Sequence, residues 1–141
     1  MSTSAARPAW SDGDDLERRT LPPVTRLQLI KYVGASGDYN PIHTIDEAAE
    51  EAGLPGVIAN GMITAATISL LFSPYLEHGY VRELKIRFLE MVHVGDEITI
   101  IAYISGREDS SEGSIYNFEV QASKEETTVA SGAVDFLIYK D

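Results

Sequence analysis

The sequence contains no cysteine, an absence that removes several kinds of chemistry at once. Disulfide bonds, thiolate nucleophiles and cysteine-ligated zinc or iron–sulfur centres are all excluded. Any catalytic site in this chain must therefore be built from oxygen and nitrogen groups.

Basic residues are also scarce, with 11 Lys and Arg against 22 Asp and Glu and a net charge of −11. Such a surface repels phosphate backbones and anionic lipid, so we expect no nucleic-acid partner and no membrane partner.

The amino terminus lacks the apolar run of roughly 7–15 residues that a secretory signal needs, and we expect a cytoplasmic protein. We assign residues 1–12 to a flexible N-terminal tail and residues 13–141 to a single domain.

Long hydrophobic runs are missing except for residues 54–76, which carry no charge. Pro55, Gly61 and Pro74 interrupt this run and leave an uninterrupted helix only from Met62 to about Phe72. A helix of that length reaches about half of the way across a bilayer core. Because this segment would be apolar nearly all round as a helix, we predict that it is buried inside a globular domain.

Local patterns predict two further helices and an edge strand. Thr25 begins a capping box that opens a helix running to about residue 35. Asp46 is placed to cap a second, short helix, which Gly53 would end in a left-handed conformation. Residues 12–23 have the composition of one short edge strand before a proline break.

From Tyr80 onward the apolar period changes to two, which predicts β-strands. The alternation runs through 84–88, 98–104, 116–122 and 134–138, with breaks at 94–96, 106–113 and 124–126. Short, turn-rich breaks predict antiparallel pairing between neighbouring strands. Only the helix from Met62 is apolar enough to cover the apolar face of such a sheet, so the fold class is α+β.

A polar loop between the first two helices places Asp38 and His43 five residues apart. Gly37 permits unusual backbone angles and Pro41 stiffens the loop, so both side chains can be aimed at one point. An imidazole suits proton transfer near neutral pH, and a carboxylate can hold a water together with it. The same residue types are the usual loop formers, so a purely structural role for the pair stays open.

Gly61 stands where the buried helix begins, between Asn60 and Met62. An unpaired N–H group and the positive end of the helix dipole would meet a ligand oxygen there. The alternative is that Asn60 caps the helix and Gly61 serves only tight packing.

A metal site built from Asp38, His43 and Asp46 is disfavoured, and we predict none. Sites of this type normally use two histidines, whereas His78 and His93 lie on unrelated segments.

Residues 35–43, Ala-Ser-Gly-Asp-Tyr-Asn-Pro-Ile-His, together with Tyr32 and Ala49, resemble the hydratase-2 signature of MaoC-like proteins. Residues 58–62 are similar to a second block of that family, and Arg87-Phe88 with residues 94–96 are similar to a third. The likeness spans roughly residues 13–140 and indicates the MaoC-like dehydratase, or R-specific enoyl-CoA hydratase, family. It implies a hot-dog fold, in which a curved antiparallel sheet wraps a long central helix. It also implies a homodimer or higher homo-oligomer in most members, and a heterodimer in some.

The resemblance implies a reaction as well. Asp38 and His43 would activate a water that attacks the β-carbon of a 2-enoyl thioester, giving an (R)-3-hydroxyacyl thioester, or would catalyse the reverse dehydration. Gly61 N–H would polarise the thioester carbonyl as an oxyanion hole. The remaining positions would support the loop or bind substrate: Ser36, Asn40, Asn60 and Met62. No cofactor is implied, because coenzyme A or an acyl carrier protein is part of the substrate.

Three basic residues, Arg82, Lys85 and Arg87, cluster on one predicted strand against the acidic background. They are candidates for contacts with the phosphates of an acyl-CoA or of an acyl carrier protein. A solvated strand face is the alternative interpretation.

Two positions depart from the family pattern, because Asn60 stands where many members have histidine and Ile45 where an acid is frequent. Three other functions also stay open: a hot-dog acyl-CoA thioesterase, a subunit of a heteromeric hydratase acting on fatty-acyl or steroid side-chain CoA esters, and a non-catalytic acyl-CoA-binding subunit, for which Asn60 is the best support. Asp38 and His43 on one loop favour hydration.

Overall fold

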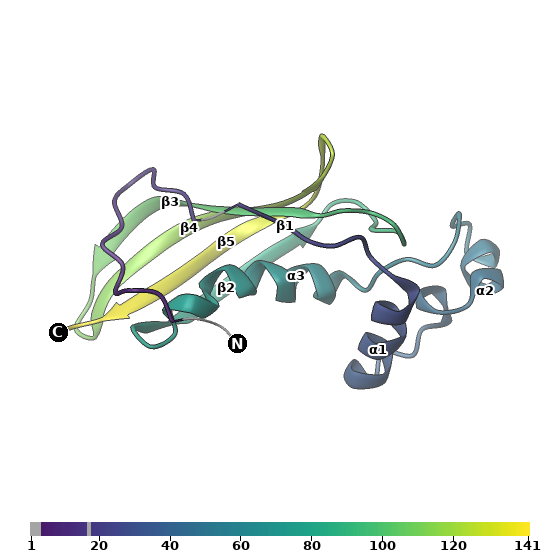
Figure 1. Ribbon diagram of the computed structural model, residues 1–141, viewed down its shortest axis with the longest axis horizontal. Coiled ribbons are helices and arrows are strands. Elements are labelled where there is room, and N and C mark those ends of the chain that lie inside the picture. Colours follow the sequence, from purple (N-terminus) through teal and green to yellow (C-terminus); the bar gives the residue numbers. More distant parts are fainter. Residues whose placement is uncertain (1–3, 17) are drawn as a thin grey trace.

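The computed structural model describes residues 4–16 and 18–141. It contains a five-stranded sheet with one helix packed along a face and two short helices beyond one end (Figure 1). The strands are β1 (Arg19–Thr20), β2 (Gly79–Phe88), β3 (Thr99–Asp109), β4 (Gly113–Lys124) and β5 (Thr127–Tyr139). The helices are α1 (Arg26–Ser36), α2 (Asp46–Glu51) and α3 (Gly61–Ser69), with 3-10 segments η1 (Pro41–His43) and η2 (Leu70–Tyr75).

All strand pairs are antiparallel, and the spatial order is β1-β3-β4-β5-β2. The four long strands and the short edge strand are confirmed. The prediction that neighbours in sequence pair was wrong for β2, which pairs with β5 at the opposite edge from β1. Residues 89–98 make the connection from β2 to β3, and it is too long for a tight hairpin. The predicted break at 106–113 was also too wide, because β3 passes through Gly106 with a register shift and ends at Asp109.

The hydrophobic core lies between α3 and the sheet. Ile68 and Phe72 are fully buried, and so are Ile100, Phe118 and Phe136 on the strands that face them. This confirms the buried central helix, although its regular α-helical part ends earlier than predicted. Pro74 explains the early end, because proline has no N–H and its ring clashes with the carbonyl four residues before it. The chain therefore tightens into η2 after Ser69.

Trp10 lies within the segment expected to be a flexible tail, but it packs onto the domain. The centroid of its ring lies 4.8 Å from that of Tyr75 and 5.1 Å from those of Tyr116 and Phe118, and each pair is arranged edge-on. Ala5 N–H donates to the Pro74 carbonyl at 2.9 Å. The described part of the segment is docked, because an indole offers more apolar area than any other side chain nearby. Residues 1–3 of the expected tail lie outside the described residues.

Of the two helix caps predicted at Thr25 and Asp46, the structure contains only the first. Thr25 Oγ1 accepts the Gln28 N–H at 3.1 Å, as predicted. The predicted cap by Asp46 was wrong, because Ile45 is the N-cap residue of α2 and Asp46 pairs with Arg26 at 3.0 Å instead. Within the described residues, no helix combines the length and apolar character that a bilayer crossing requires.

Candidate active site

The loop that joins α1 to α2 is fixed by three short-range hydrogen bonds. Gly37 ends α1 in the left-handed region with φ +74°, a conformation that favours glycine. Ser36 Oγ accepts the Asp38 N–H at 3.2 Å, and Asn40 Oδ1 accepts the Ile42 N–H at 3.3 Å. Asp38 Oδ1 accepts the Asn40 N–H at 3.4 Å. Ser36 and Asn40 thus support the loop, as the sequence predicted.

His43 is buried, with 7% of its surface exposed, and its ring is held in one orientation. Its Nδ1 lies 2.7 Å from the carbonyl oxygen of Ile58. Because a carbonyl only accepts, Nδ1 carries a proton, and in the neutral imidazole Nε2 is the ring nitrogen with the free lone pair. The fixed tautomer is the one that a proton acceptor at Nε2 requires.

Asp38 lies beside that lone pair. Its Oδ2 is 3.6 Å from His43 Nε2, which is too far for a direct hydrogen bond. A water at about 2.8 Å from both atoms would donate one proton to each of them. The Asp38 side chain is half exposed at 51%, so such a water can exchange with solvent or substrate. The structure therefore brings the two predicted catalytic residues together in a geometry that can hold and deprotonate a water.

Residues 57–60 run alongside this loop. Ile58 N–H donates to the Ile42 carbonyl at 3.2 Å, and Ala59 N–H donates to the Val92 carbonyl at 2.8 Å. Asn60 Nδ2 then donates to Asp38 Oδ2 at 2.7 Å. The two predicted sequence blocks thus form one hydrogen-bonded site.

Gly61 is the first residue of α3 and is exposed. The alternative that Asn60 caps the helix through its side chain was wrong, because the side chain makes no capping bond. A β-carbon at Gly61 would come within 3.1 Å of the Phe88 ring, closer than ordinary packing allows. Met62 is also exposed, at 57%. Among the described residues, the Gly61 and Met62 N–H groups have no hydrogen-bond partner, so both are available to a ligand oxygen.

The three basic residues lie on β2, as predicted, and none of them is buried. Arg82 and Arg87 are separated by about 16 Å along an extended strand. Arg82 lies 4.0 Å from Glu108, and Lys85 lies 3.2 Å from Glu83. Arg87 precedes Phe88, the residue that contacts Gly61. Successive residues of a strand point to opposite faces of the sheet, so the Arg87 side chain is directed away from the face on which Phe88 meets Gly61.

An apolar cavity of about 270 Å³ borders α3 next to Asn60. Ile63, Thr64 and Thr67 line it and follow Asn60 at helical spacing on one face of α3. Its other walls come from distant segments: Leu21, Pro22, Pro23, Val24, Thr25, Gln28, Ala59, Val92 and Ile98. The sequence prediction missed this cavity. The helical spacing from Asn60 was a usable signal for one wall, but the rest depends on tertiary packing.

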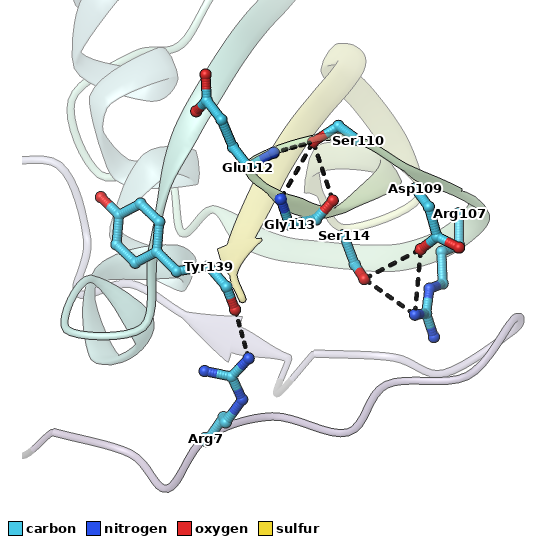
Figure 2. A network of polar contacts seen from close by, with 8 residues as sticks. All are labelled: Arg7, Arg107, Asp109, Ser110, Glu112, Gly113, Ser114 and Tyr139. Carbon is cyan, nitrogen blue, oxygen red and sulfur yellow. Dashed lines mark hydrogen bonds and ion pairs between the residues drawn. The ribbon is translucent and has the colours of Figure 1, made fainter. Parts of the chain in front are cut away.

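A second polar cluster lies at the opposite end of the sheet, near the C-terminus (Figures 1 and 2). Arg107 donates to Ser114 at 2.9 Å and pairs with Asp109 at 3.4 Å, while Arg7 donates to the Tyr139 carbonyl. A cavity of about 770 Å³ lies there and is lined by none of the candidate residues. Arg7 also pairs with Asp141 at 3.3 Å, so each of the two arginines has an acidic partner.

No three His, Asp or Glu side chains within 4–16 and 18–141 are grouped so as to hold a metal ion. Asp46, the third member of the disfavoured metal set, is held by Arg26.

Comparison with protein families gives a match to the MaoC like domain over residues 11–130. One relative is the fatty acid synthase subunit beta of Aspergillus oryzae, 40% identical over 72 residues, or 49% of this chain. Another is 3-hydroxyacyl-thioester dehydratase X of Mycobacterium tuberculosis, 44% identical over 54 residues, or 34% of this chain. The matches cover only 4% and 19% of those two proteins.

Solved structures share the fold. An (R)-hydratase from A. caviae involved in PHA biosynthesis has a TM-score of 0.82 at 18% identity, with 92% of this chain and 98% of that chain covered. The ChsH1-ChsH2 complex from Mycobacterium tuberculosis has a TM-score of 0.80 at 12% identity, with 91% and 98% covered. An assembly of two different chains therefore occurs among the structural neighbours. These likenesses confirm the hot-dog fold, and with the family match over residues 11–130 they establish that the chain belongs to the MaoC-like domain family.

Proposed function

We propose that this protein hydrates 2-enoyl thioesters to (R)-3-hydroxyacyl thioesters, or catalyses the reverse dehydration. The observation that carries the proposal is the geometry of the pair, with Asp38 Oδ2 3.6 Å from His43 Nε2, the ring nitrogen opposite the one that donates to Ile58. This pair suits a water that must lose a proton while it attacks carbon. The family relationship supports the same reaction class.

In the hydration direction, the water oxygen forms a bond to the β-carbon of the substrate. One water proton passes to the Asp38–His43 pair, and the electrons of the carbon–carbon double bond move toward the thioester oxygen. Gly61 N–H donates to that oxygen as its negative charge develops, a contribution typically of about 10²–10³ in rate. The pair returns a proton to the α-carbon, so the reaction adds one water and needs no further cofactor. Acid–base transfer contributes about 10²–10⁴.

The proposal also assigns binding surfaces to the acyl chain and the phosphates of the substrate. The apolar cavity beside Thr64 and Thr67 takes the acyl chain. The exposed basic residues of β2, Arg82, Lys85 and Arg87, are the candidates for contacts with the phosphates of coenzyme A or of the carrier protein's prosthetic group. A homodimer and a cytoplasmic location remain part of the proposal. The ChsH1-ChsH2 neighbour makes a heteromeric assembly the alternative to a homodimer.

The test uses the purified protein with crotonyl-CoA. Hydration removes the conjugated double bond and its ultraviolet absorbance, while free thiol is followed in a parallel assay. We expect loss of conjugation without thiol release. Thiol release would instead identify a thioesterase, in which the same water attacks the carbonyl carbon. Binding without turnover of crotonyl-CoA and of longer enoyl-CoAs would contradict the proposal and identify an acyl-CoA-binding subunit.

A further inference from the structure

Asn60 stands at the N-cap position of α3 but does not cap the helix with its side chain. An asparagine at the N-cap position normally accepts a hydrogen bond from a backbone N–H of the first turn. Asn60 occupies that position with φ −63° and ψ 133°, yet its side chain makes no capping bond. Only its backbone carbonyl accepts the Ile63 N–H, at 3.0 Å. The side chain is turned away from the helix that it precedes.

The side chain instead serves Asp38 and leaves one of its own atoms unsatisfied. Nδ2 donates to Asp38 Oδ2 at 2.7 Å, whereas the buried Oδ1 has no hydrogen-bond partner within the described part of the chain. Reversing the amide would set Oδ1 against a carboxylate oxygen, and both atoms are acceptors. The carboxylate therefore dictates the amide orientation. A buried carbonyl oxygen without a partner destabilises the fold, as does the missing cap.

The hydrogen bond from Asn60 ends on the Asp38 oxygen that faces His43. Oδ2 is the oxygen 3.6 Å from His43 Nε2, while Oδ1 accepts the Asn40 N–H. A donor on each oxygen fixes the plane of the carboxylate, although half of the side chain is exposed. Of the two bonds, the one from Asn60 is the shorter, at 2.7 Å against 3.4 Å for the one from Asn40, which is at the long end of the hydrogen-bond range. The Asn60 bond is therefore the more effective restraint.

We propose that Asn60 is a positioning residue, kept at a cost to folding stability, whose amide N–H holds Asp38 Oδ2 in line with His43. The missing capping bond and the unpaired Oδ1 both follow from the orientation of this amide toward the carboxylate. Departures from local rules of this kind concentrate at functional sites. The inference rests on the proposed function, because turnover is one of its readouts.

The test compares Asn60→Ala with Asn117→Ala. Asn117 is a matched control, because its Nδ2 donates to Asp135 Oδ1 at 2.8 Å between β4 and β5, away from the candidate site. We expect Asn60→Ala to lower kcat for crotonyl-CoA by about 10- to 100-fold, with KM changed less than about threefold. Its melting temperature should equal or exceed that of the wild type. The control should give the reverse pattern, a lower melting temperature with kcat unchanged.

Two further variants separate the N–H donor from the shape of the side chain. Asn60→Asp keeps the shape but removes the donor, and we expect it to lose at least as much rate as Asn60→Ala. Asn60→His restores a ring N–H, and we expect it to recover most of the rate. An unchanged kcat in Asn60→Asp, or a rise in KM in place of the fall in kcat, would overturn the inference.

A readout without substrate keeps this inference distinct from the proposed function. Three-bond NMR couplings should report one χ1 rotamer of Asp38 in the wild type and an average over rotamers in Asn60→Ala. If the wild type does not hydrate crotonyl-CoA but the rotamer is lost in the variant, the proposed function fails and the positioning role stands. If the wild type turns over and the rotamer and rate survive in Asn60→Ala, the positioning role fails and the function stands.

Discussion

The ring of Phe88 lies against Gly61, so close that a β-carbon there would approach it to 3.1 Å. Phe88 is half exposed at 48%, so its ring can move by a few tenths of an ångström. We expect Gly61→Ala to leave the free energy of unfolding within about 1 kcal/mol of the wild type, because alanine favours a helix and offsets the displaced ring. The added methyl group crowds the first N–H groups of α3, so hydratase kcat should fall at least about tenfold.

The two effects are measured separately, by urea unfolding and by crotonyl-CoA turnover. Equal losses of stability and rate would mean that the variant is merely misfolded. An unchanged rate would remove the start of α3 from the mechanism.

Asp38→Asn tests the proposed base directly. The amide oxygen that this substitution introduces can still accept from Asn60, so the loop should fold as before, but the side chain no longer carries negative charge. We expect hydratase kcat to fall by at least about 100-fold, within the range of acid–base catalysis. Circular dichroism and the melting temperature serve as the control. Near-normal turnover would exclude Asp38 as a catalytic residue.

The cavity beside α3 predicts the acyl-chain preference. Thr67 lines it, and Thr67→Leu adds apolar volume inside it. We expect kcat/KM for dodecenoyl-CoA to fall about tenfold, a typical effect of small volume changes in an apolar pocket, while crotonyl-CoA is barely affected. Ala66→Leu is the matched control, because Ala66 is the exposed neighbour on the same helix. If both variants change the chain-length profile equally, the acyl chain lies elsewhere.

Asp96 predicts a pH dependence of stability. Burial alone would raise the pKa of this carboxyl, but the His93 N–H at 2.8 Å and Lys124 Nζ at 3.0 Å outweigh it and hold the pKa below its usual range. A depressed folded-state pKa stabilises the protein above the unfolded-state pKa and loses this effect as pH falls through the folded-state value. Asp96→Asn should therefore cost about 2 kcal/mol near pH 7.

The difference between Asp96→Asn and the wild type should shrink as pH falls below about 4, because the unfolded state binds a proton there before the native carboxylate does. Urea unfolding at a series of pH values measures it. A difference that stays constant down to about pH 2, below the ordinary range of the group, would show that the lost contribution is packing and not charge.

Trp10 predicts that the N-terminal segment contributes to stability. Its ring packs on Tyr75, Tyr116 and Phe118, so Trp10→Ala should lower the free energy of unfolding by about 2–4 kcal/mol, somewhat below the value for a fully buried ring. Arg7→Ala is the comparison variant, because the exposed Arg7–Asp141 pair should contribute less than about 1 kcal/mol. Similar unfolding curves for Trp10→Ala and the wild type would restore the flexible-tail interpretation.

Elements whose signals are local could be predicted from the sequence. Thr25 caps α1 because the bond to Gln28 spans three residues, and the four long strands are visible in their alternation. Asp38 and His43 could be proposed as a pair because one short, stiff loop carries both. Their supports could be named for the same reason, since the bonds of Ser36 and Asn40 span two residues.

Features that depend on distant partners could not be predicted. Asp46 leaves its capping position because Arg26, twenty positions earlier, competes for the carboxylate. Strand β2 joins β5 because the sheet offers an edge there that no local pattern reveals. Trp10 docks on aromatic residues more than 60 positions away. The turn of Asn60 toward Asp38, and not toward its own helix, likewise follows from tertiary structure.

The hydrogen-bonding side chains of the candidate site all come from residues 36–61, whereas the cavity beside them also needs residues 21–28, 92 and 98. Under the proposed function, the reacting bond and the acyl chain are thus recognised by largely different stretches of sequence. Substitutions in the second set would then change the preferred acyl chain while the first set stays intact. In that case, related domains can diverge in the acyl chains that they accept and still share one reaction.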